Sequence, residues 1–69
     1  MIQIVGGKLD GQCSPAQLLQ IEEKGETYML TEYSELVGDR KVRHQFYMLT
    51  GGPTVEEAVK IYKGRLKAA

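Results

Sequence analysis

The chain has 69 residues with nine acidic and nine basic side chains, so it carries no net charge at neutral pH. A chain of this length supports one hydrophobic core, and we expect a single domain over residues 1–69. One cysteine, Cys13, and one histidine, His44, exclude an intrachain disulfide and a classical zinc site within a single chain. We expect neither a metal ion nor a cofactor.

We expect no secretory leader, and no apolar run in the sequence is long enough to cross a bilayer. We therefore expect a soluble, cytoplasmic protein with no membrane partner, and the lone thiol suits a reducing compartment. Very small domains without disulfides or metal ions often complete their cores by self-association, so we also expect a homo-oligomer.

Charge is distributed unevenly along the chain. Residues 1–39 contain seven acidic and two basic side chains, whereas residues 40–69 contain seven basic and two acidic ones. If folding preserves this separation, the surface is dipolar and can select a charged partner or pair head to tail with a second copy.

The first predicted element is a β-strand over residues 2–5, which ends at the pair Gly6-Gly7. Residues 17–23 then alternate apolar and polar side chains, which is the pattern of a half-buried strand. A helix is the alternative for this segment, because the preceding Ser14-Pro15 can begin one. We favour the strand, since residues 24–26 make a natural hairpin turn.

Two further strands are predicted, over residues 27–33 and 41–50, with a turn at Gly38-Asp39 between them. The second of these places two sets of side chains on opposite faces. One set is Val42, His44, Phe46 and Met48, and the other is Lys41, Arg43, Gln45, Tyr47 and Leu49.

The final predicted element is an amphipathic helix over residues 54–67. Thr54 and Glu57 have the spacing of a capping box, in which each side chain pairs with the backbone amide of the other residue. The apolar stripe of this helix comprises Val55, Ala58, Val59, Tyr62 and Leu66.

Together these elements predict an α+β fold, in which the C-terminal helix packs on a small antiparallel sheet of three or four strands. The short loops between the strands favour antiparallel pairing, because parallel neighbours need crossovers of a dozen or more residues.

A catalytic site would have to combine Cys13 or Ser14 with His44, since a cysteine and a histidine in contact form an activated nucleophile. His44, however, shares a strand face with apolar side chains, where a structural histidine is the commoner outcome. We therefore expect no catalytic residue and a protein that is not an enzyme.

One candidate binding surface combines basic side chains with an aromatic one on an exposed sheet face, an arrangement that suits a nucleotide or single-stranded nucleic acid. Its residues are Arg40, Lys41, Arg43 and Tyr47, joined by Lys60 and Lys63 from the helix. The alternative is that these charges are the ordinary solvated face of an amphipathic strand.

A candidate protein interface comprises apolar side chains that the core does not obviously require: Tyr33, Leu36, Val37 and Ile61. An exposed strand edge would add backbone pairing with a partner or with a second copy.

The stretch VGGKLDGQ, in its strand-then-turn context, resembles the opening of many small uncharacterised bacteriophage and prophage proteins, which begin with a strand and a Gly-Gly-Pro-x-Asp-Gly turn. Lys8 stands where that pattern commonly has proline. The resemblance implies a phage-type accessory protein with a small β-rich fold, of a kind that commonly modulates or inhibits a host protein. The leading hypothesis is therefore a non-enzymatic interaction protein, and the alternative is a nucleotide or nucleic-acid binding module.

Overall fold

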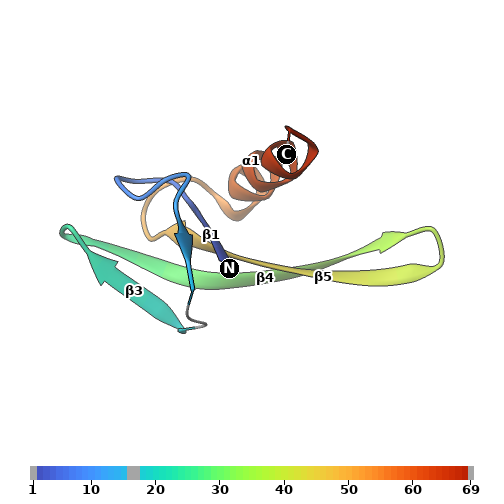
Figure 1. Cartoon of the computed structure of the whole chain (residues 1–69), viewed down its shortest axis with the longest axis horizontal. Coiled ribbons are helices and arrows are strands. Elements are labelled where there is room, and N and C mark those ends of the chain that lie inside the picture. Colours follow the sequence, from blue (N-terminus) through green and yellow to red (C-terminus); the bar gives the residue numbers. More distant parts are fainter. Residues whose placement is uncertain (1, 16–17, 69) are drawn as a thin grey trace.

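The computed structural model describes residues 2–15 and 18–68, which fold into a five-stranded sheet and a C-terminal helix (Figure 1). The strand order across the sheet is β2-β1-β5-β4-β3. The elements are β1 (Ile2–Val5), β2 (Cys13–Ser14), β3 (Gln20–Glu23), β4 (Glu26–Val37), β5 (Arg40–Leu49) and α1 (Val55–Ala68).

The α+β class is confirmed, but the expected antiparallel sheet of three or four strands is wrong, because the sheet has five strands and is mixed. β1 pairs in parallel with β5, with Ile4 opposite Tyr47 and Val5 opposite Met48. The crossover that a parallel pair requires consists of all the intervening strands, so no dedicated crossover helix is needed. The two-residue strand β2 was not predicted.

The remaining strands agree with the sequence patterns more closely. Residues 20–23 form a strand, so the helix alternative is wrong there, while Gln17, the expected start of that strand, lies outside the described residues. β4 continues to Val37, four residues beyond the predicted end, and the turn at residues 38–39 lies where it was predicted.

Helix α1 begins with the predicted capping box. The amide of Glu57 donates to Thr54 Oγ1 at 3.2 Å, and the amide of Thr54 donates to Glu57 Oε1 at 3.3 Å. The ends of the predicted apolar stripe remain open, since Val55 and Leu66 are 53% and 47% exposed. No helix in the described part of the chain combines the length and apolar character that crossing a membrane requires.

The sheet is covered on both faces. Successive side chains of a strand point to opposite sides, so neighbouring residues of β1 and of β5 enter different cores. Val5 and Phe46 pack with Ala58 under the helix. Ile4 and Tyr47 pack with Tyr28 and Leu9 on the other face. Both cores therefore depend on the β1–β5 pair.

The loop after β1 covers the face opposite the helix. Leu9, 3% exposed, lies over the sheet, and its amide donates to the buried Tyr28 hydroxyl at 3.1 Å. That hydroxyl donates to Glu26 Oε1 at 2.8 Å, and the same oxygen accepts the amide of Lys8 at 2.7 Å. The Lys8 amide is the main cause that lowers the pKa of Glu26, and the Tyr28 hydroxyl is the next.

A second contact ties this loop to the helix. Arg65 donates to both carboxylate oxygens of Asp10, each at 2.7 Å, and Asp10 Oδ1 also accepts the Gly6 amide at 2.7 Å. The Arg65 guanidinium is the main cause that lowers the pKa of Asp10, and the Gly6 amide is the next. The VGGKLDG stretch is therefore held by its own backbone, by β4 and by α1.

Gly7 provides a test of this loop. Its φ is +67°, and a Cβ would lie 2.6 Å from the Tyr28 hydroxyl and 2.8 Å from Glu26 Oε1. We expect Gly7→Ala to lower the free energy of unfolding by about 2–4 kcal/mol, combining left-handed strain with displacement of these groups. Gly11→Ala is the matched control, because Gly11 has φ +88° and open space at Cβ, so only strain of about 1–2 kcal/mol applies. Equal losses in urea denaturation would contradict the steric part.

Asp10 provides a pH test. A carboxyl whose pKa is lower in the folded state adds stability above its unfolded pKa, here about 3.8, and that stability disappears as the pH falls through the folded pKa. Because Asp10 is partly open to solvent, we expect Asp10→Asn to cost only about 0.2–1 kcal/mol at pH 7. Urea denaturation between pH 6 and pH 2.5 should show a smaller acid loss in this variant than in the wild type; parallel curves would rule out the linkage.

Candidate functional site

The candidate site is the outer part of the β4–β5 hairpin, residues 31–45, which we call the arm. β3 pairs only with Glu26–Met29 of β4, and β1 pairs only with Tyr47 and Met48 of β5. Beyond these contacts the two strands pair with each other alone, from Thr31 opposite Phe46 to the tip. In Figure 1 the arm extends past the helix and past the other strands.

Aromatic packing holds the base of the arm against the helix. The rings of Tyr33 and His44 stack with centroids 4.8 Å apart, and those of Phe46 and Tyr62 stack at 5.2 Å. Edge-to-face contacts join the two pairs, at 6.1 Å between Tyr33 and Phe46. We call these four residues the aromatic corner. Such ring pairs add stability beyond the area they bury, so the arm has a defined direction.

A short chain of polar contacts runs beside the aromatic corner. Lys63 Nζ lies 2.6 Å from Glu35 Oε2, and His44 Nε2 lies 3.2 Å from Glu35 Oε1. The other ring nitrogen of His44 lies 3.4 Å from the Tyr62 hydroxyl. The hydrogen bond from Lys63 is the main cause that lowers the pKa of Glu35, and the same contact raises the pKa of Lys63. The helix therefore supports both strands of the arm.

The tip of the arm exposes apolar side chains to solvent. Leu36 is 77% exposed and Val37 is 57% exposed, and they lie next to each other in sequence and hence on opposite faces of β4. Neither residue belongs to one of the two cores. Exposed aliphatic groups on a projecting hairpin are a common feature of protein-interaction surfaces.

Charges on the arm are balanced. Arg43 Nη2 donates to Glu32 Oε1 at 2.6 Å, and Gln45 Nε2 donates to Glu32 Oε2 at 2.9 Å. Arg43 is the main cause of the lowered pKa of Glu32. Arg40 and Lys41 are exposed and take part in none of the ion pairs found among residues 2–15 and 18–68.

The six residues of the predicted basic surface do not come together. Tyr47 is fully buried, and its hydroxyl accepts the Leu18 amide at 2.8 Å and donates to the Leu18 carbonyl at 2.7 Å. The expectation of an exposed Tyr47 ring is therefore wrong, because the N-terminal segments cover that face. Arg40, Lys41 and Arg43 lie on the arm, whereas Lys60 and Lys63 lie on α1, where Lys63 binds Glu35.

The four residues of the predicted protein interface do not lie together either. Leu36 and Val37 are exposed at the tip, Tyr33 is half-buried in the aromatic corner, and Ile61 is 40% exposed on the helix. Sequence reasoning missed Glu35 and Tyr62 as supports of the arm. After Tyr33 the residues Ser-Glu-Leu-Val do not alternate apolar and polar side chains, so this local pattern gave no sign that β4 is longer than predicted.

Cys13 and His44 belong to different parts of the fold. Cys13 lies on β2, and β1 separates that strand from β5, which carries His44. The polar contacts of His44 are with Glu35 and Tyr62. Among the described residues no group of three or more His, Cys, Asp or Glu side chains is arranged to hold a metal ion.

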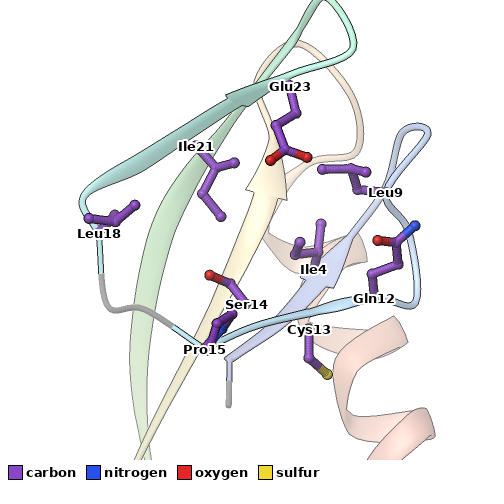
Figure 2. A pocket seen from close by; sticks show the side chains of 9 residues that line it. All are labelled: Ile4, Leu9, Gln12, Cys13, Ser14, Pro15, Leu18, Ile21 and Glu23. Carbon is purple, nitrogen blue, oxygen red and sulfur yellow. The ribbon is translucent and has the colours of Figure 1, made fainter.

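A small hollow of about 260 Å³ lies between β3 and the β1–β2 pair. Figure 2 shows Ile21 and Glu23 of β3 projecting into the space beside Ile4 and Leu9. Its lining combines aliphatic side chains with polar ones, and the Glu23 carboxylate is the charged group. The volume of this hollow is below the range of about 300–1,000 Å³ that is typical of small-molecule sites.

Comparison with known proteins gives no match to a protein-family model, to a curated protein or to a solved structure.

Tyr33 offers a test of the aromatic corner. Its hydroxyl is buried and has no hydrogen-bond partner, and burial is the main cause that raises its pKa. Because Tyr33→Phe removes an unsatisfied polar atom and keeps the ring stack, we expect unchanged stability or a gain of up to about 1 kcal/mol. Tyr28→Phe is the control, because it breaks the contacts to Leu9 and Glu26 and should lose about 1–2 kcal/mol. A clear loss in Tyr33→Phe by thermal denaturation would contradict this assignment.

Proposed function

We propose that this chain is a small non-enzymatic interaction protein of the phage-accessory type, which uses the arm to contact and modulate a host protein. The observation that carries the proposal is the exposure of Leu36 and Val37 at the end of a hairpin that projects beyond the rest of the fold. Side chains that contribute nothing to the core are free to serve a partner.

The support at the base of the arm favours this use. A binding segment that already has its bound conformation avoids much of the ordering entropy of association. The aromatic corner and the Lys63–Glu35 ion pair hold the arm against α1, so its tip is presented in a defined direction. The resemblance of VGGKLDGQ to phage protein openings supports the choice of a bacterial host protein as the partner.

The alternative of a nucleotide or nucleic-acid binding module is not favoured. Its stacking residue, Tyr47, is buried, and the three basic side chains of the arm are accompanied by three acidic ones, so long-range attraction to a polyanion is weak. The acidic side chains are Glu32, Glu35 and Asp39.

Affinity capture from the bacterial host can test the proposal. We expect tagged wild-type protein to retain a specific host protein, and Leu36→Glu to reduce retention at least about tenfold, because a carboxylate would be desolvated at the contact. Val55→Glu is the control, since Val55 is 53% exposed on the helix, away from the arm. Binding must be reproduced with the purified partner. Equal retention by both variants, or no retained protein, would overturn the proposed role of the arm.

A further inference from the structure

The two open edges of the sheet carry opposite charge. β3 is the outermost strand on one side, and along the arm β5 is the outermost strand on the other. The first edge carries Glu22 and Glu23, and the second carries Arg40 and Lys41. All four side chains are exposed, and none takes part in the ion pairs of the described chain. Open strand edges have backbone groups available for pairing.

We propose that copies of this chain associate head to tail, with β3 of one copy pairing antiparallel with residues 40–43 of the next. The inference rests on the proposed function, because it keeps the chain an interaction protein and identifies a second copy as one of its partners. The host contact at Leu36 lies on β4, which is not the strand that pairs in this assembly, although Leu36 is opposite Lys41 of β5.

One antiparallel register opposes acid with base twice and an aliphatic side chain with another. At the fourth position an amide opposes the Arg43 guanidinium, which also binds Glu32 within its own copy. The opposed residues are Glu23 with Arg40, Glu22 with Lys41, Ile21 with Val42, and Gln20 with Arg43.

The faces of the two sheets agree with this register. Ile21 contributes to the core opposite the helix, and Glu23, two residues later, shares its face. On β5, Val42 and Arg40 share the face of Phe46, which is the helix side. Adjacent copies are therefore related by a half-turn about an in-plane axis across the strands. That operation reverses strand direction, as antiparallel pairing requires, and places successive helices on alternate sides of the joined sheet.

The same register accounts for the exposure of Leu19. This side chain is 82% exposed in the single chain, although it directly precedes β3. Continuing the pairing by one residue brings Leu19 opposite His44, on the side where the partner copy has its aromatic corner. Association therefore moves an exposed leucine toward aromatic rings, which adds apolar burial to the charge pairing.

The same charges disfavour pairing between two like edges. Two β3 edges would oppose carboxylates, and two β5 edges would oppose guanidinium and ammonium groups, so symmetric pairing is unfavourable. A head-to-tail contact that does not close produces open assemblies. We expect oligomers that grow with concentration beyond the dimer.

Sedimentation equilibrium and light scattering of the purified full chain can measure this. The weight-average mass should rise with concentration at low salt and fall at about 1 M NaCl, where the Debye length is about 3 Å. Glu22→Lys should raise the apparent dissociation constant by about tenfold or more, whereas Glu56→Lys, the same charge change on the exposed helix, should leave it unchanged.

A mixing experiment identifies the two edges. Glu22→Lys/Glu23→Lys has two basic edges, and Arg40→Glu/Lys41→Glu has two acidic edges. Each variant alone should remain monomeric, and an equimolar mixture should assemble again. If circular dichroism shows that the first variant does not fold, the second variant still tests the proposal. Its β5 edge carries the reversed charge, so this variant alone should not assemble. A monomeric wild type, or assembly that both reversals leave intact, would overturn it.

The outcomes separate this inference from the proposed function. Assembly is measured without a host protein, and host capture depends on Leu36. A wild type that stays monomeric but loses its host partner on Arg40→Glu/Lys41→Glu would show that these two positive charges contribute to the host contact. That result would reject self-pairing and leave the interaction role in place.

Discussion

The hydrogen bonds of the buried Tyr28 hydroxyl hold the loop after β1 over the sheet, and the covered face opposite the helix depends on them. The hydroxyl accepts the Leu9 amide and donates to Glu26, and Glu26 in turn accepts the Lys8 amide. These bonds place Leu9 over Tyr28 and Tyr47 and so close the face that the helix does not reach. A chain of this size cannot leave one face of its sheet open, because it has little other apolar area to bury.

With both faces of the sheet covered near β1, the outer part of the arm lies outside the two cores. The aromatic corner and the Lys63–Glu35 ion pair stabilise its base, and the tip makes no contribution to either core. Along this one hairpin, residues near Tyr28 and Tyr47 stabilise the domain, whereas Leu36 is exposed to solvent, which is why we propose the tip as the contact surface.

The sequence predicted the features that local patterns encode. The capping box at Thr54, the turn at Gly38 and the alternating faces of β5 depend on neighbouring residues, and each is confirmed. Strand neighbours are different, because alternation does not say which distant strand lies beside β1. The predicted exposure of Tyr47 was wrong for a related reason: its face was assigned correctly, but the tertiary positions of distant residues such as Leu9 and Leu18 determine that this face is covered. Glu35 and Tyr62 were missed as supports of the arm because their contacts also join residues that are distant in the sequence.

The separation of the arm from the core also affects how the sequence can change over time. Substitutions at exposed positions that contact nothing else usually alter stability by about 0.5 kcal/mol or less. The tip residues Leu36, Val37, Arg40 and Lys41 are exposed and lie outside both cores, so we expect small effects there as well. Substitutions at the tip should therefore cost less stability than substitutions at Gly7, Tyr28 or Arg65, whose contacts stabilise the fold. If the arm binds a partner as we propose, its contact residues can therefore change at little cost to the stability of the fold.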